Sequence, residues 1–135
     1  MEKITVEAVL ENLQTVIDFA TEKLEERDCS MKIVTQTELV IEEIFVNIAN
    51  YAYHPETGSA TFCIEFEENP NAVLMTFIDC GKHYNPLEQA TPDTTLAIDE
   101  REVGGLGIFL VKKNVDEISY EYTDGKNILH MKKFF

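Results

Sequence analysis

The sequence has few cysteines, few basic residues and no long apolar segment. Its three cysteines are an odd number without a C-x-x-C pair, which argues against a disulfide framework and against a zinc site. Lysine and arginine number 11 against 25 acidic residues, so the net charge is −14 and the cationic face that nucleic acids and anionic membranes require is missing. No apolar run approaches the ~18 residues of a membrane span, and the acidic start MEKITVEAVLENL is unlike a signal peptide. We therefore expect a cytoplasmic protein that binds basic protein surfaces, with no direct contact to nucleic acid or membrane.

Two helices are predicted in the first half of the chain. With 44% hydrophobic and 27% charged residues, the composition is that of an ordinary globular domain. Apolar residues at spacings of three and four predict an amphipathic helix over Val9–Leu24. A second helix is expected over Gln36–Tyr53, with Thr35 or Thr37 as its cap and Pro55 beyond its end. Because this helix is apolar over most of its circumference, we expect it to be buried on several sides.

Strand patterns occupy both halves. Ile4–Val6 and Lys32–Val34 are predicted as short strands, the first at an edge, and Ala60–Glu67 alternates as a half-buried strand does. Ala72–Asp79 is apolar on both faces until its last residue, which is typical of a central strand.

A hairpin is predicted at the C-terminal end. Ile118–Tyr122 and Asn127–Met131 flank the turn signal Asp124-Gly125, and this pairing sets Tyr120 opposite Leu129. A short helix over Leu106–Asn114 precedes the hairpin.

The stretch from Gly81 to Val103 has no sustained period. A loop of more than ~15 residues in a compact domain is a lid, a binding loop or a disordered segment. Glycines lie at both of its ends, and at the second end Gly104, Gly105 and Gly107 open a short helix. Such a helix start can bind phosphate through free N–H groups, or the glycines can simply serve a loop-to-helix turn.

Three polar residues interrupt apolar elements. Glu43 and Asn47 are four apart and so share one face of the second helix. They either bind a hydrated Mg²⁺ or supply a carboxylate that activates a hydroxyl, or they are capping or packing polar groups or a helix edge that faces water. Asp79 ends the central strand and is either an acceptor for an exocyclic amine or a turn residue. The histidines His54, His83 and His130, with Tyr84, show no metal-ligand spacing, and we interpret them as surface or packing residues.

The order of these features resembles the Bergerat (GHKL) ATP-binding fold of histidine kinases and gyrase. Within it, the chain is most similar to the small anti-sigma-factor serine/threonine kinases (RsbW-like). ELVIEEIFVNIANYAY resembles their N box, FIDCGKHYNP the first glycine box and VGGLGIFLVKK the second. The similarity covers nearly the whole chain, which we take as one domain, 1–135, with a nucleotide lid over about 81–103.

The resemblance implies a role for each motif residue. Glu43 would be the general base, and Asn47 would bind Mg²⁺. Asp79 would bind the adenine amino group of ATP, with Gly81 beside the base. The residues expected around the phosphates or near the adenine are Gly104, Gly105, Gly107, Arg101 (as the nearest cation) and Asn127 (where relatives often carry a Thr).

The resemblance also implies a fold and a function. The fold would be an α/β two-layer sandwich, a mixed, mainly antiparallel sheet with helices on one face. The protein would be an ATP-dependent anti-sigma factor that binds a sigma factor and phosphorylates a serine of an anti-anti-sigma (STAS-type) protein. The family also suggests a homodimer.

Two other functions stay open. Some relatives carry an Arg immediately before the second glycine box, where this chain has Val103. Without that cation the developing charge of phosphoryl transfer loses stabilisation, which favours an ATP-binding interaction module without kinase activity. The other alternative is the detached ATPase domain of a two-component histidine kinase. Against it, no leading helical hairpin carries a phospho-accepting His, since all three histidines lie at or after position 54.

Overall fold

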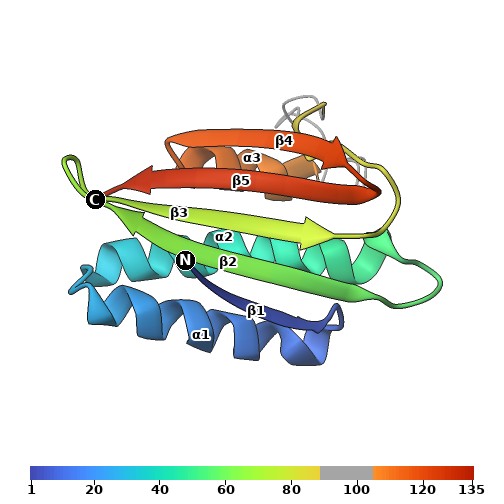
Figure 1. The fold of residues 1–135 in the computed structure, drawn as a ribbon, viewed down its shortest axis with the longest axis horizontal. Coiled ribbons are helices and arrows are strands. Elements are labelled where there is room, and N and C mark those ends of the chain that lie inside the picture. Colours follow the sequence, from blue (N-terminus) through green and yellow to red (C-terminus); the bar gives the residue numbers. More distant parts are fainter. Residues whose placement is uncertain (89–104) are drawn as a thin grey trace.

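One sheet covered on one face by helices forms the architecture, as seen in Figure 1. The computed structural model describes residues 1–88 and 105–135. The strands, in their order across the sheet, are β1 (Glu2–Glu7), β2 (Ser59–Glu67), β3 (Ala72–Asp79), β5 (Lys126–Phe134) and β4 (Glu117–Thr123). The helices are α1 (Leu13–Glu26), α2 (Met31–Asn47) and α3 (Gly105–Asn114). Short 3-10 segments are η1 (Leu10–Asn12) and η3 (Pro86–Glu88), and a π-helical segment, η2 (Ile48–Ala52), continues from α2.

All four strand pairings in the described sheet are antiparallel, which confirms the predicted two-layer sandwich with a mainly antiparallel sheet. β1 is an edge strand and β3 is central, as the sequence predicts. The hairpin register is confirmed, since Tyr120 pairs with Leu129. Its turn residues Asp124 and Gly125 both have positive φ, at 53° and 75°, as a two-residue hairpin turn of type I′ requires.

The core lies between the sheet and the helices. Alternate residues of the strands face α1, α2 and α3, and burying these apolar side chains drives the two layers together. The largest fully buried side chains are Phe45, Phe62, Phe77, Leu24, Ile41, Ile64 and Met75. The face of α1 that the sequence predicts to be apolar is buried at Val16, Ala20 and Leu24. The helix itself begins at Leu13, after η1, rather than at Val9.

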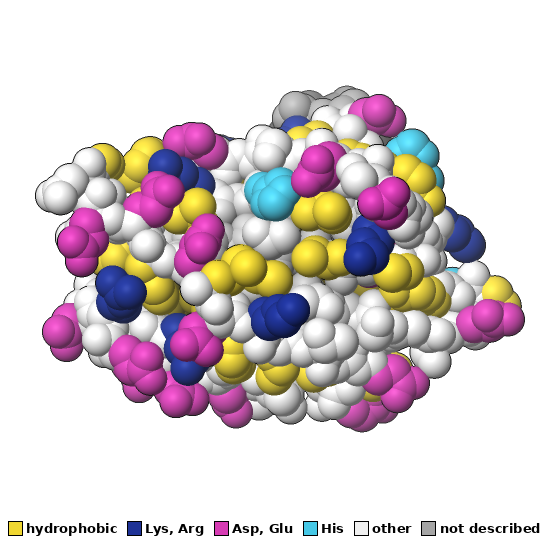
Figure 2. All heavy atoms as spheres, viewed as in Figure 1, with side chains coloured by type: hydrophobic (Ala, Val, Ile, Leu, Met, Phe, Trp, Pro, Cys, Tyr) yellow, Lys and Arg dark blue, Asp and Glu magenta, His cyan; other side chains and the backbone are white. Residues whose placement is uncertain are grey.

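The opposite face of the sheet has no helix over it among the described residues. Figure 2 shows hydrophobic side chains on this face lying between basic and acidic ones. The Thr5 and Thr61 hydroxyls are hydrogen-bonded at 2.8 Å, and Lys132 pairs with Glu67 at 2.8 Å. Polar cross-strand pairs of this kind suit a face that contacts water.

The predicted strand Lys32–Val34 is wrong, because these residues form the first turn of α2. The helix begins at Met31, and the Ser30 side chain accepts a hydrogen bond from the Ile33 N–H at 3.3 Å, as an N-cap does. Thr35 and Thr37, the predicted caps, both lie inside the helix. The β-branched residues Ile33 and Val34 favour a strand locally, but the cap and the burial of the following helix outweigh that preference.

Replacing the observed cap tests this boundary. We expect Ser30→Ala to lower the free energy of unfolding by ~0.5–2 kcal/mol, because an orphan N–H of the first turn loses its acceptor. Thr35→Ala is the matched control. This side chain is exposed within α2, and alanine is the better helix former, so stability should stay the same or rise slightly. Denaturant unfolding of both variants measures the difference, and a larger loss for Thr35→Ala would contradict the assigned start.

Candidate functional site

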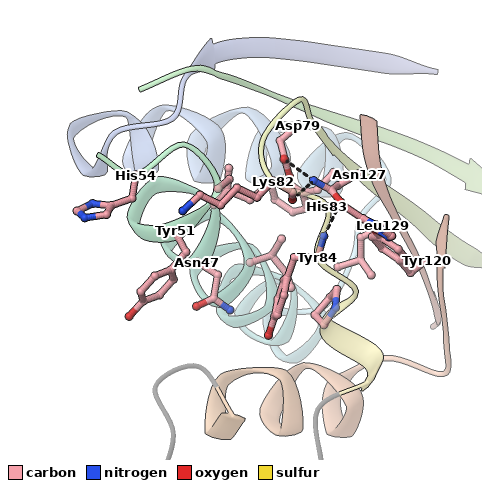
Figure 3. A pocket seen from close by; sticks show the side chains of 15 residues that line it. Asn47, Tyr51, His54, Asp79, Lys82, His83, Tyr84, Tyr120, Asn127 and Leu129 are labelled. Atoms are coloured by element: carbon pink, nitrogen blue, oxygen red, sulfur yellow. Dashed lines mark hydrogen bonds between the residues drawn. The ribbon is translucent and has the colours of Figure 1, made fainter. Parts of the chain in front are cut away.

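A cavity of about 460 Å³ lies between the end of α2 and the sheet, and it is shown in Figure 3. Apolar side chains such as Ile44, Ile48, Phe77 and Leu129 form much of its lining. Asn47, Asp79 and Asn127, three of the predicted site residues, also line it. The cavity is therefore an apolar pocket with a few polar groups, the usual form of a small-molecule site.

Asp79 and Asn127 are direct partners across β3 and β5. The Asn127 amide donates to Asp79 Oδ1 at 3.0 Å, and the Gly81 N–H donates to the same oxygen at 2.9 Å. Asp79 is 8% exposed. Burial raises the pKa of its carboxyl above the ordinary value of 3.8, and these two hydrogen bonds oppose that rise.

The loop after Asp79 is held closely against the end of η2, the segment that follows α2. The Lys82 N–H donates to the Ala52 carbonyl at 2.9 Å. A Cβ added at Gly81 would lie 2.4 Å from that carbonyl oxygen, so no side chain fits there. Tyr53 adds a second attachment, because its hydroxyl accepts from the Cys80 N–H at 2.7 Å and donates to the Ser59 carbonyl at 2.6 Å. Gly81 is thus required by this contact within the protein.

Glu43 of α2 meets Gly107 of α3. A Cβ added at Gly107 would lie 2.6 Å from Glu43 Oε2 and 3.9 Å from Asn47 Nδ2. The two helices therefore bring Glu43 and Asn47 beside Gly107, one of the predicted glycines. Partial burial, and to a smaller degree the neighbouring Glu42 charge, raise the pKa of the Glu43 carboxyl above its ordinary value of 4.5.

Other predicted positions are described only in part. Gly105 is the first residue of α3, close to the predicted start at Leu106. Gly104, Arg101 and Val103 lie outside the described residues, and so does most of the predicted lid, since the description stops at 88 and resumes at 105.

Several cavity residues were not expected from the sequence. His54, His83 and Tyr84, interpreted as surface or packing residues, line the cavity together with Lys82 and Tyr120. The register that places Tyr120 beside Leu129 was the available signal for that tyrosine, because it lies on the same face as the site.

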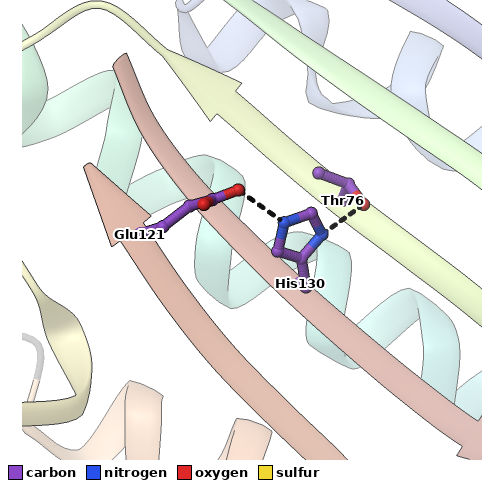
Figure 4. Close-up of polar contacts among 3 residues, drawn as sticks. All are labelled: Thr76, Glu121 and His130. Atoms are coloured by element: carbon purple, nitrogen blue, oxygen red, sulfur yellow. Dashed lines mark hydrogen bonds and ion pairs between the residues drawn. The ribbon is translucent and has the colours of Figure 1, made fainter. Parts of the chain in front are cut away.

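His130, in contrast, lies outside the cavity. Its ring is hydrogen-bonded to Thr76 at 3.1 Å and to Glu121 at 3.2 Å on the open face of the sheet, as shown in Figure 4. For this histidine the surface interpretation is confirmed.

The donor set suits a hydrated cation. Among residues 1–88 and 105–135 there is no group of three or more His, Cys, Asp or Glu that could hold a metal ion alone. Asn47 nevertheless contributes an amide to the cavity, with the Glu43 carboxylate nearby. Mg²⁺ keeps several waters and uses few protein ligands, so this pair of oxygen donors fits it.

None of the described helices is long and apolar enough to cross a membrane.

Comparison with known proteins identifies the family. Residues 6–133 match the histidine kinase-like ATPase domain, and the chain belongs to this family. It is also similar to the serine/threonine-protein kinase BtrW of Bordetella bronchiseptica, with 26% identity over 91 residues. That alignment covers 67% of this chain and 63% of the length of BtrW.

The raised pKa of Glu43 predicts that the ionised side chain lowers the free energy of unfolding. The folded state holds this proton more tightly than the unfolded chain, so the group's contribution to stability is full below its ordinary pKa of 4.5 and is lost as pH rises through the folded-state value. We expect Glu43→Gln to match the wild type near pH 4 and to melt at a higher temperature near pH 7. Glu22→Gln, on the exposed face of α1, is the control and should bring no such gain. A Glu43→Gln protein less stable than the wild type at pH 7 would contradict this assignment.

Proposed function

We propose that the protein is an ATP-dependent anti-sigma factor with serine kinase activity, formed by one domain over residues 1–135. In one state it binds a sigma factor, and in another it phosphorylates a serine of an anti-anti-sigma protein. The observation that carries the proposal is that Asn47, Asp79 and Asn127, from separate segments, line one cavity, and that Asn47 and Glu43 of α2 also face Gly107 of α3. Asp79 and Asn127 lie at the sheet, Asn47 lies on α2, and Glu43 lies against Gly107 of α3.

In this proposal the nucleotide lies between the sheet and the start of α3. Asp79 accepts a hydrogen bond from the adenine amino group. The phosphates extend toward Gly105 and Gly107, where a helix start offers free N–H groups and a favourable dipole. Mg²⁺, when bound, neutralises phosphate charge, and Asn47 would hold it. Arg101 and Gly104 are further proposed phosphate contacts.

Glu43 is the proposed general base. Its carboxylate takes the proton of the substrate serine hydroxyl, and the serine oxygen attacks the γ-phosphorus. The bond from that phosphorus to the ADP oxygen breaks, so phosphoserine and ADP are the products. A carboxyl with a raised pKa is a better proton acceptor near neutral pH than an ordinary glutamate.

The proposed partners rest on similarity and on charge. BtrW is named a serine/threonine-protein kinase, which supports serine as the acceptor here. The net charge of −14 favours a sigma factor with a basic surface. A second candidate is an ATP-binding interaction module without transferase activity, which Val103 favours because it stands where some relatives carry a cation.

The base contact can be tested by binding. Asp79→Asn keeps an oxygen for Asn127 and Gly81 but presents NH₂ to the adenine amino group, so we expect Mg-ATP affinity to fall by roughly 10- to 150-fold. Asp116→Asn is the control, because Asp116 also accepts a backbone N–H, from Phe134 at 2.8 Å, but lies away from the cavity. Calorimetry measures the Mg-ATP affinity of both variants and of the wild type. Unchanged affinity in folded Asp79→Asn would remove Asp79 from the site.

Catalysis and metal binding should separate in a second pair of variants. Glu43→Gln cannot accept a proton, so phosphoryl transfer should fall by roughly 10²–10⁴ while ATP binding survives. Asn47→Ala loses an oxygen ligand, so Mg²⁺-dependent ATP affinity should fall as well. Glu38→Gln is the control on the same helix. Glu38 accepts a hydrogen bond from the Thr21 hydroxyl of α1 and does not line the cavity.

Transfer is measured with γ-labelled ATP and candidate anti-anti-sigma proteins. Full activity in Glu43→Gln would exclude Glu43 as the base. A wild type that binds ATP and phosphorylates no partner would replace the kinase proposal with the interaction module.

A further inference from the structure

Asn127 is a buried amide whose hydrogen-bonding capacity is used within the protein. A carboxamide has two N–H donors and two acceptor lone pairs. The Asn127 donors reach Asp79 Oδ1 at 3.0 Å and the Lys82 carbonyl at 2.8 Å. Its carbonyl accepts from the Tyr84 N–H at 3.1 Å and from the Tyr120 hydroxyl. At 7% exposure, it has all four capacities occupied by protein groups.

These bonds join four separate parts of the cavity wall. Asn127 lies on β5, Asp79 ends β3 and Tyr120 lies on β4, while Lys82 and Tyr84 belong to the loop that follows Asp79. Figure 3 shows the amide of Asn127 between the Asp79 carboxylate and this loop. One side chain therefore fixes both the carboxylate and the loop beside it.

The same geometry separates the two oxygens of Asp79. Among the described residues, the hydrogen bonds to this carboxylate come from Asn127 and Gly81, and both end on Oδ1. Oδ2 is then the acceptor that can receive an amino group in the cavity. Rotation of the carboxylate would break both bonds to Oδ1, so the amide fixes the direction in which Oδ2 points.

We propose that Asn127 is a positioning residue for nucleotide-base recognition, which acts through Asp79 and does not itself bind the nucleotide. This inference rests on the proposed ATP site. It differs from the expectation that residue 127 contacts the adenine directly, because a direct contact would require one of four existing hydrogen bonds to break.

A nearly isosteric pair of variants tests the role. Asn127→Val removes every polar group, and we expect it to weaken Mg-ATP binding at least tenfold, on the order expected for losing a hydrogen bond to a charged group. Asn127→Thr keeps one hydroxyl that can donate to Asp79, so it should retain more affinity than the valine variant. Mg-tripolyphosphate, which has no base, should bind both variants as it binds the wild type. A merely structural defect would weaken both ligands.

A double-mutant cycle separates positioning from contact. In an Asp79→Asn background, Asn127→Val should change Mg-ATP affinity by less than about twofold, because its effect passes through the Asp79 carboxylate. A loss of the same size in both backgrounds, or equal loss of tripolyphosphate binding, would overturn the proposal.

Folding failure is covered by a milder variant. If Asn127→Val does not fold, Tyr120→Phe removes one bond to the Asn127 carbonyl, and its smaller loss should also vanish in the Asp79→Asn background. A wild type that binds neither ligand refutes the proposed ATP site itself. If Asn127→Thr and Asn127→Val bind ATP as tightly as the wild type does, only the role of Asn127 is refuted.

Discussion

The pairing of β3 with β5 is the constraint on which the cavity depends. It sets Asp79 directly opposite Asn127, and both side chains point to the helix-covered face because residues alternate along a strand. Phe77 and Leu129 pair on the same face, where one is fully buried and the other nearly so. A shift of β5 by one residue would turn Asn127 and Leu129 to the open face, away from Asp79 and Phe77. The polar site therefore owes its geometry to apolar packing two residues away.

Both carboxylates of the proposed mechanism work against the stability of the fold. Burial raises the pKa of Asp79 and of Glu43, which means that the ionised forms are disfavoured in the folded protein. α2 is otherwise apolar over most of its length, with Val40, Ile41 and Phe45 fully buried. A carboxylate among such residues has no packing advantage over a neutral side chain. In the proposed mechanism its presence is explained by its role as the general base, and the fold tolerates it because the surrounding helix buries so much apolar surface.

Periodicity in the sequence was sufficient for most of the fold. The alternation in β2, the two apolar faces of β3 and the Asp124-Gly125 turn each follow from neighbours within a few residues, and each prediction is confirmed. The start of α2 was predicted wrongly because Lys32–Val34 has strand propensity, whereas its helical state depends on the Ser30 cap and on burial against distant elements. Local patterns identify elements well, and they fix the ends of elements poorly.

The cavity wall shows a different kind of limit. The motif order led to Asp79 and Asn127, but not to the reason that they are held together, because the bonds of Asn127 come from two strands and a loop. No spacing along the chain encodes that Tyr84 and Tyr120 supply the remaining donors to this amide. Such a network is determined by the requirement that a buried amide satisfy its polar atoms. This requirement acts only once the strands have paired and the loop has packed against them. A site of this kind is therefore specified by tertiary packing, even where its principal residues can be found in the sequence.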